Sequence, residues 1–334
     1  MLSVLSKLTE KVLKGDDLSF EEVAPLVEIT KQCDIVTLIN FANIIRDEFK
    51  GANIETCAIM NAKSGRCSED CVFCSQSAHH HTQIDRYPLS NIEDIIEKAK
   101  EAKAFGADRF SVVTSGRDIH GKTDLESICK AIEDISQTIE IGRCASLGTL
   151  TKDSARSLRM AGLERYHHNL ETSRSFFPKI CSTHSFEDRV DTIGIAKEAG
   201  FSVCAGGIFG LGESPLQRIE MAFDLKELDV DSIPLNFLNP IPGTPLEDSI
   251  PIPPMEILKT LAIYRFIHPQ MDIRVCGGRY KNLRGIQALM YLAGINAVMI
   301  GNYLTTPGCD PAEDLQLIKD LMLTPRKSGK HLTE

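Results

Sequence analysis

A recurring pattern in the middle of the chain constrains the fold more than any other feature. Four times, a helical stretch ends in an apolar residue and a glycine, and an apolar segment follows within about three residues. Each glycine suits the left-handed position that ends a helix and turns the chain into a sheet. These glycines are Gly106, Gly162, Gly200 and Gly294. The pattern predicts alternating helices and strands, and therefore parallel strands joined by right-handed crossovers.

Eight apolar segments fit the strands of such a fold. They span residues 55–61, 109–114, 139–146, 164–169, 201–208, 232–238, 272–276 and 296–300. Helix starts lie between them, with capping boxes expected at Ser90 with Glu93 and at Ser185 with Asp188. Eight such units over about 250 residues predict an α/β fold, a (β/α)8 barrel of the TIM type, complete or slightly open.

The two ends of the chain lie outside this repeat. Residues 1–50 predict a helical extension of two or three amphipathic helices that stop at Gly51. Residues 51–305 then form the barrel, and residues 306–334 form a short C-terminal tail with a helix near Pro311–Leu323. The polar stretch Thr324–Glu334 is expected to be disordered.

Composition narrows the class of protein. Forty-six acidic against 37 basic residues give a net charge of −9, which argues against nucleic-acid and membrane-surface partners. No apolar run approaches the roughly 18 residues that span a bilayer, and residues 1–15 lack the apolar core of a signal peptide. Eleven cysteines in such a chain indicate a reducing compartment, where thiolates serve metals or redox chemistry. We expect a cytoplasmic enzyme.

Cys67, Cys71 and Cys74 stand on one short segment, separated by three and then two residues. Three thiolates can hold three irons of a cubane cluster and leave the fourth iron open to another ligand. Closed zinc sites prefer paired knuckles with four ligands, and ferredoxins use four cysteines per run, so both fit this segment less well. The spacing resembles that of radical S-adenosylmethionine (SAM) enzymes. In that family an aromatic residue at the position of Phe73 packs near the adenine of SAM.

Other candidate ligand contacts lie where predicted strands end, at the catalytic face of a parallel barrel. The segment Tyr166–Thr172 ends a strand with polar side chains on both faces, and Asn236 ends another. The glycine-rich turn Gly206–Gly212 permits close approach of a ligand to the backbone. The histidine run at residues 79–81 is expected to be a solvated or ligand-flanking loop rather than a metal site.

Strand cysteines form a candidate second metal site. Alternation along a strand places Arg274 and Cys276 on one face. Three further strand cysteines could meet them inside the barrel: Cys57, Cys144 and Cys204. The alternative is that each simply packs in the core, as buried cysteine often does. The remaining cysteines are interpreted as structural or incidental: Cys33, Cys129, Cys181 and Cys309.

Taken together, these segments resemble the biotin synthases over roughly residues 30–320. The resemblance is carried by Cys67–Gln76, Tyr166–Ser173, Val203–Glu213, Ile233–Leu246 and Arg274–Arg279. It implies a radical SAM barrel in which Cys67, Cys71 and Cys74 hold a 4Fe-4S cluster whose open iron is chelated by SAM. Implied cofactor contacts are Phe73, Asn169, Glu171, Arg189, Gly206 and Ile208, although the family often has Asp at the position of Glu171. Asn169 and Asn236 are the implied contacts of the substrate, dethiobiotin.

The reaction that the resemblance implies is insertion of sulfur into dethiobiotin to form biotin. A radical derived from SAM abstracts hydrogen from an unactivated carbon, and an auxiliary iron–sulfur cluster donates the sulfur. A reductant such as flavodoxin or ferredoxin would supply electrons, and the family predicts a homodimer. The cofactors carry the difficult chemistry, and the protein positions the substrate between the two clusters.

One position departs from the family pattern. The family commonly holds a 2Fe-2S cluster through three strand cysteines and an arginine. Cys144, Cys204 and Arg274 match three of these ligands, but the fourth falls at Ser111. Because serine is a poor replacement for a thiolate at iron, we expect a different ligand set. The hypothesis is a larger, four-iron auxiliary cluster held by Cys57, Cys144, Cys204 and Cys276.

Two other functions remain open at this point. Another radical SAM barrel of similar build, of the hydrogenase-maturation or methylornithine-synthase type, would need no sulfur-donating cluster and hence no strand cysteines. A non-catalytic iron–sulfur electron carrier would need neither the glycine-rich turn nor the polar strand ends.

Overall fold

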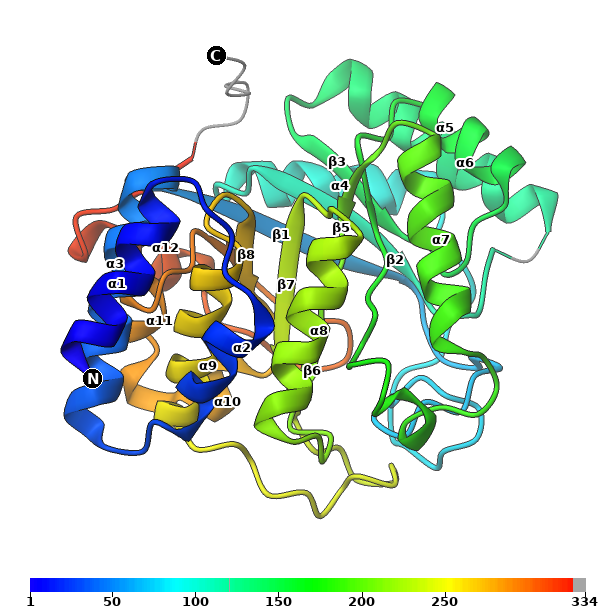
Figure 1. The fold of residues 1–334 in the computed structure, drawn as a ribbon. Coiled ribbons are helices and arrows are strands. Elements are labelled where there is room, and N and C mark those ends of the chain that lie inside the picture. The colour runs from blue at the N-terminus through cyan, green and yellow to red at the C-terminus, as the bar shows by residue number, and fades with distance from the viewer. Residues whose placement is uncertain (120, 327–334) are drawn as a thin grey trace.

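A closed barrel of parallel strands forms the centre of the computed structural model, which describes residues 1–119 and 121–326 (Figure 1). Neighbouring strands are hydrogen-bonded around the ring, and the first strand pairs with both the second and the last, which closes it. The strands are β1 (Asn53–Lys63), β2 (Arg109–Thr114), β3 (Gly142–Ser146), β4 (Arg165–His167), β5 (Ser202–Cys204) with β6 (Gly207–Phe209), β7 (Ser232–Phe237), β8 (Asp272–Val275) and β9 (Ala297–Met299). The predicted barrel is confirmed and is complete.

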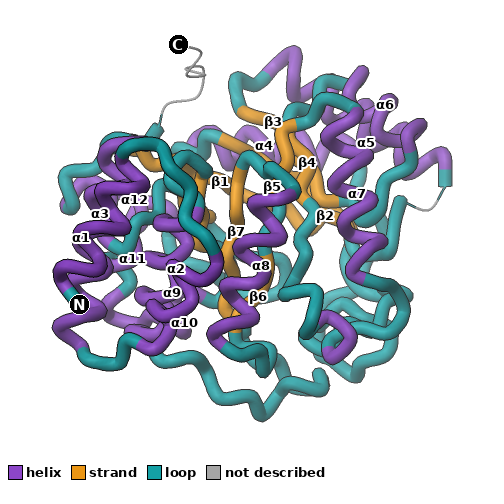
Figure 2. The backbone as a smooth tube through the Cα atoms, in the orientation of Figure 1, coloured by secondary structure: helices purple, strands orange, loops and turns teal. Residues whose placement is uncertain are grey.

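Helices cover the outside of the barrel (Figure 2). They are α4 (Ile92–Ala104), α5 (Lys122–Thr138), α6 (Lys152–Met160), α7 (Phe186–Glu198), α8 (Pro215–Glu227) and α9 (Pro254–Ile267), with η2 (Phe177–Lys179) before α7. Between β8 and β9 the single crossover helix is replaced by three short ones: α10 (Arg279–Leu283), η3 (Arg284–Ile286) and α11 (Leu289–Leu292). All four glycines of the recurring pattern have a positive φ, as predicted.

The predicted helix starts are confirmed at one position and wrong at another. Ser185 caps α7, and its side chain and that of Asp188 form the reciprocal capping box. At α4, in contrast, the cap is Asn91, whose side chain accepts a hydrogen bond from the backbone of Asp94. Asn91 provides a side-chain oxygen acceptor one residue later than Ser90, so α4 starts after Asn91 and the capping box predicted at Ser90 does not form.

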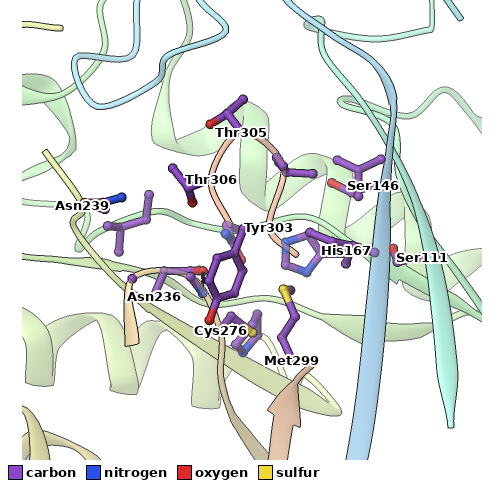
Figure 3. A pocket seen from close by; sticks show the side chains of 18 of the residues that line it. Ser111, Ser146, His167, Asn236, Asn239, Cys276, Met299, Tyr303, Thr305 and Thr306 are labelled. Carbon is purple, nitrogen blue, oxygen red and sulfur yellow. Dashed lines mark hydrogen bonds between the residues drawn. The ribbon is translucent and has the colours of Figure 1, made fainter. Parts of the chain in front are cut away.

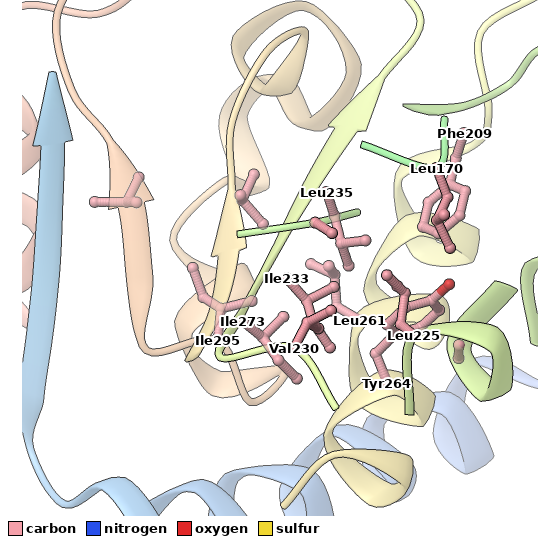
Figure 4. Close-up of a cluster of buried hydrophobic side chains, with 14 of the residues drawn as sticks. Leu170, Phe209, Leu225, Val230, Ile233, Leu235, Leu261, Tyr264, Ile273 and Ile295 are labelled. Atoms are coloured by element: carbon pink, nitrogen blue, oxygen red, sulfur yellow. The ribbon is translucent and has the colours of Figure 1, made fainter. Parts of the chain in front are cut away.

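The N-terminal segment is helical, as predicted, and ends at Gly51 with a φ of 60°. It contains α1 (Leu2–Leu13), α2 (Phe20–Val23), η1 (Ala24–Glu28) and α3 (Gln32–Lys50). Because α3 packs against α9, the outer side of α9 is covered. Its inner side packs on the barrel, where Leu261 lies close to Ile233 of β7 (Figure 4). This double burial explains why every residue of α9 from Ile257 to Ile267 is buried, on all sides of the helix.

The prediction of disorder from Thr324 onward is wrong for its first residues. After α12 (Pro311–Asp320), the short strand β10 (Thr324–Pro325) pairs in parallel with the start of β1. The start of β1 extends beyond its pairing with β9, so its backbone groups are free to bond with Thr324 and Arg326. Backbone pairing therefore overrides the polar composition there, and residues 327–334 lie outside the described part. No helix in the described ranges is long and apolar enough to cross a membrane.

Candidate active site

Two adjoining cavities open at the carboxyl end of the barrel strands. The larger, here called the main chamber, has a volume of about 360 Å³, and the smaller, here called the loop cavity, about 190 Å³. Phe73, Cys74, His167, Asn169 and Glu171 border both cavities. The two spaces therefore share one wall, built from the cysteine segment and the end of β4.

The three cysteines of the predicted cluster segment all border the loop cavity. The segment follows β1 and folds back on itself, since the Cys67 N–H donates to the Gln76 carbonyl at 3.0 Å. A tight turn follows, in which the Cys74 N–H donates to the Cys71 carbonyl at 2.9 Å. Three thiols on one wall, with open space in front of them, fit a cluster that takes three protein ligands and leaves one position free.

A polar network faces the three cysteines and joins the predicted SAM contacts. Arg189 donates to the Asn169 carbonyl at 2.9 Å and lies 3.5 Å from a Glu171 carboxylate oxygen. The Asn169 side chain donates to Glu171 at 3.2 Å. Glu171 adopts a φ of 71°, which non-glycine residues rarely do, and Arg189 Nε is buried with no hydrogen-bond partner in the described structure. These features are typical of a site built to receive a polar ligand.

The two residues predicted from the glycine-rich turn have different positions. Ile208 borders the main chamber. Gly206 lies behind the wall, where its N–H donates to the Asn169 side chain at 3.1 Å. A Cβ at Gly206 would come within 2.0 Å of the Pro234 carbonyl oxygen, so this position excludes any side chain. Gly206 therefore supports Asn169 rather than lining either cavity.

All four strand cysteines and Arg274 border the main chamber and are buried. Arg274 lies with its Nη1 3.6 Å from the Cys204 sulfur, and its Nε has no partner in the described structure. Ser111 also borders the chamber, paired in register with Cys144. Burial raises the pKa of the Cys57 thiol to about 12. All four thiols border one cavity, so the structure brings the predicted strand cysteines together.

Below these thiols lies a buried ion-pair cluster centred on Glu55. Its carboxylate accepts hydrogen bonds from Arg109 at 2.9 Å, from Arg165 at 2.8 Å, and from Arg274. Burial alone would raise the pKa of Glu55, but the three guanidinium groups hold it well below its usual value. Arg165 borders both the main chamber and a polar cavity of about 700 Å³ at the opposite end of the barrel. The ion-pair cluster thus forms the floor of the main chamber.

Asn236 is the predicted substrate contact, and it faces the main chamber near Tyr303 (Figure 3). Its side-chain oxygen accepts from the Gly277 N–H at 2.9 Å, and its nitrogen donates to the Gly207 carbonyl at 3.2 Å. These bonds fix the amide, and within the described residues its second N–H hydrogen has no protein acceptor. A fixed amide suits a neutral ligand that offers hydrogen-bonding groups.

One wall of the main chamber was not predicted. The loop after β9 contributes Tyr303, Leu304, Thr305 and Thr306. Thr305 is hydrogen-bonded to the Ser75 hydroxyl at 3.1 Å, and the Leu304 carbonyl accepts from Asn61 at 3.2 Å. The signal was present, because two adjacent threonines follow the last barrel strand at the catalytic end. His167, also on the shared wall, is neutral near pH 7 because burial lowers its pKa to about 4.

Two further groups of side chains lie beside the cysteine segment. His79 and His80 each place Nε2 3.0 Å from a backbone carbonyl of that segment, in line with the expected flanking loop. Cys181, in contrast, was interpreted as incidental, but its sulfur lies 3.8 Å from that of Cys71. The hydrogen bond from Cys71 is the main cause that lowers the pKa of Cys181 to about 4. No spacing in the sequence relates these two cysteines, which are joined only by the packing of two loops.

Comparison with known proteins agrees with this geometry. The barrel and its three-cysteine loop define a radical SAM enzyme, and residues 62–225 match the model of the Radical SAM superfamily. Residues 234–324 match the Biotin and Thiamin Synthesis associated domain. The biotin synthase of Geobacter sulfurreducens is 49% identical over 327 residues, covering 98% of this chain and 99% of the relative. That of Clostridium acetobutylicum is 47% identical over 315 residues, covering 94% and 96%. The chain belongs to the biotin synthase family.

Solved structures support the fold. A methylornithine synthase superposes with a TM-score of 0.84 at 20% identity, covering 96% of this chain and 98% of that one. The FeFe-hydrogenase maturase from Carboxydothermus hydrogenoformans gives 0.80 at 19% identity, covering 96% and 79%. At these identities the likeness concerns architecture alone, so the alternative functions gain no support from it.

Proposed function

We propose that this enzyme inserts sulfur into dethiobiotin to form biotin, using SAM and two iron–sulfur clusters. The observation that carries the proposal is a single chamber with Asn236 on one wall and four buried thiols on its inner end. That chamber shares a wall with the loop cavity, so a substrate inside it would lie between two sulfur-rich sites. A methylornithine-synthase or hydrogenase-maturation function would leave the four chamber thiols without a role.

The chain supplies ligands, orientation and exclusion of water. Cys67, Cys71 and Cys74 would hold a 4Fe-4S cluster, and the Asn169–Glu171–Arg189 network with Phe73 would hold SAM. When bound, the cluster and SAM supply the radical that activates the substrate. Apolar side chains on the chamber wall keep water from that reaction, namely Ile59, Val113, Ile208, Leu238 and Met299.

We further propose that Cys57, Cys144, Cys204 and Cys276 hold the auxiliary cluster, with four irons, as the sulfur donor. Support comes from the four thiols bordering one chamber, and from Ser111 at the position of the usual fourth ligand. The partnerless Nε of Arg274 points to a further acceptor beside these thiols. Iron, being thiophilic in such clusters, favours the four sulfurs over a serine hydroxyl.

An anaerobic assay with SAM, dithionite and dethiobiotin tests the proposed reaction. Biotin and 5′-deoxyadenosine are the expected products. Formation of 5′-deoxyadenosine without a sulfur-containing product would point instead to the hydrogenase-maturation or methylornithine-synthase type of enzyme.

Iron and sulfide counts on anaerobically purified protein test the auxiliary ligand set. Two four-iron clusters predict about eight irons per chain, whereas one four-iron and one two-iron cluster predict about six. Cys276→Ala is expected to lower the count to about four, while Cys129→Ala, on α5 and away from both cavities, leaves it unchanged. A count of about six that Cys57→Ala and Cys276→Ala do not lower would refute this ligand set.

Three further properties of the enzyme are part of the same proposal. They are an electron donor of the flavodoxin or ferredoxin type, a homodimer and a cytoplasmic location. We also keep the division into a helical extension at 1–50, a catalytic barrel at 51–305 and a C-terminal segment at 306–334.

A further inference from the structure

Beside the three-cysteine segment, at the edge of the loop cavity, lies a cluster of metal-binding side chains of which the proposed reaction uses only Cys71. The loop between η2 and α7 brings Cys181 and His184 against Cys71. The Cys181 sulfur lies 3.8 Å from that of Cys71 and 3.1 Å from His184 Nδ1. Both cysteines are 7% exposed, as is the side chain of His184. These three groups are therefore packed together away from solvent.

The spacing of the two sulfurs matches that of ligands on one metal ion, and His184 Nε2 lies 3.8 Å from the Cys181 sulfur. Two thiolates bound at about 2.3 Å to a tetrahedral ion lie about 3.8 Å apart, which is the separation of the Cys71 and Cys181 sulfurs. The ligand atoms of Cys71, Cys181 and His184 all lie within 4.8 Å of one another. Two cysteines and a histidine are the donor set that Zn²⁺ and Fe²⁺ accept in proteins.

A supporting shell fixes two of these ligands. Glu69 places a carboxylate oxygen 2.5 Å from His184 Nδ1 and itself accepts a hydrogen bond from the Thr183 hydroxyl at 2.8 Å. Asp70 accepts from the Cys181 thiol at 3.1 Å and from the Ser182 N–H at 2.9 Å, which ties the two loops together. Carboxylates that orient a histidine ligand are typical of built metal sites, and both add negative charge beside a cation.

We propose that Cys71, Cys181 and His184 bind one divalent thiophilic ion, Zn²⁺ or Fe²⁺, in the cluster-free protein, with Glu69 holding the histidine ring through Nδ1. Cys71 is also a proposed ligand of the 4Fe-4S cluster, so the ion and the cluster compete for its thiolate. This site does not depend on the identity of the substrate.

Titration of the reduced, cluster-free chain with Co²⁺ under anaerobic conditions tests the site. Tetrahedral Co²⁺ with thiolate ligands absorbs visibly, so the bound ion can be counted. The chamber thiols can also bind Co²⁺. The number of Co²⁺ ions bound per chain is therefore compared between each variant and the parent. Cys181→Ala is expected to lower the count by about one per chain, and His184→Asn to weaken that ion about 100-fold or more, since even an outer-shell change costs about 10- to 100-fold.

Two variants separate this site from binding by the cysteine segment alone. Cys67→Ala removes a proposed cluster ligand outside the new site, so it should retain the Co²⁺ ion that Cys181→Ala loses. Loss of that ion in Cys67→Ala, or its retention in both Cys181→Ala and His184→Asn, would overturn the proposal. Cys129→Ala controls for the loss of a thiol elsewhere and should match the parent.

Iron uptake during cluster reconstitution shows whether the Cys181→Ala and His184→Asn variants have folded. Cys181→Ala and His184→Asn should take up as much iron as the parent, whereas Cys67→Ala should take up less. Should Cys181→Ala lose iron as Cys67→Ala does, Cys181 would be a cluster ligand and the separate site would be refuted. The biotin assay is a separate measurement. A negative Co²⁺ result would refute the metal site but not the proposed reaction, and a negative biotin assay would refute the reaction but not the metal site.

Discussion

Replacement of Glu55 by glutamine tests how the floor of the main chamber is stabilised. Glu55 is 2% exposed and its carboxylate balances the guanidinium groups of Arg109, Arg165 and Arg274. Glutamine has nearly the same shape but carries no charge, so it leaves three buried cations around a neutral amide. Removal of one partner from a buried ion pair costs about 3–5 kcal/mol, because the remaining charge stays desolvated.

This loss corresponds to a measurable change in melting temperature. The unfolding entropy of about 2.1 cal/mol/K per residue gives about 0.7 kcal/mol/K for a chain of 334 residues. A loss of 3–5 kcal/mol then lowers Tm by about 4–7 °C. Circular dichroism of anaerobic samples with matched iron content measures this shift. Glu126→Gln, whose partner Lys122 is exposed, is the control and should change Tm by less than about 1 °C.

The effect should also depend on pH in a defined direction. The folded-state pKa of Glu55 lies well below the unfolded value of about 4.5, so its stabilisation is present above that value. It is lost as the pH falls below 4.5 through the folded-state pKa. The difference between the parent and Glu55→Gln should therefore be constant from pH 8 to 5 and shrink at lower pH. A Tm for Glu55→Gln within 1 °C of the parent at pH 7 would refute this reasoning.

Three other substitutions test separate features. Burial raises the pKa of Asp224 to about 6, so its ionisation costs stability as the pH rises from about 4 through 6. After allowance for its partial exposure, Asp224→Asn should stabilise the protein by about 1–2 kcal/mol at pH 8 and by almost nothing at pH 4. Urea unfolding at the two pH values measures this difference. Gly206→Ala should abolish SAM binding, measured by equilibrium dialysis, because its Cβ would overlap the Pro234 carbonyl. Gly194→Ala, in a helix with no atom within 4 Å of the new Cβ, should instead raise stability by about 0.5–1 kcal/mol in the same unfolding assay. Equal SAM binding in the parent and Gly206→Ala, or a destabilised Gly194→Ala, would contradict these two accounts.

Much of the barrel could be predicted because its signals are local. A glycine after a helix ends that helix through its own backbone freedom, and Gly106 or Gly200 does so whatever surrounds it. Alternation within a strand likewise decides which residues share a face, and Arg274 and Cys276 do border the same chamber. The pairing of Thr324 with β1 could not be read in this way, since it depends on free backbone groups some 270 residues earlier in the chain.

The site shows the same division between local and distant information. Cys67, Cys71 and Cys74 are close in sequence, so their spacing predicts a shared ligand. Cys181 follows Cys71 by 110 residues, and its place beside that cysteine results from two loops tied through Asp70. Likewise, the Thr305 loop reaches the main chamber only because the barrel closes and brings its last strand next to β1.

Strand β1 links the two proposed cluster sites, and this has a consequence for how their separation is set. Cys57 lies within the strand, and the segment with Cys67 leaves from its end after Lys63. Each strand residue advances the chain by about 3.3 Å, and from Cys57 to Lys63 the strand pairs with β2, with one register shift between Asn61 and Lys63, so this paired segment sets the separation of the two sites. A substitution at another position around the chamber, such as Ser111, would therefore leave the distance between the two sites unchanged. An inserted residue within β1, by contrast, would alter that distance and turn Cys57 away from the chamber.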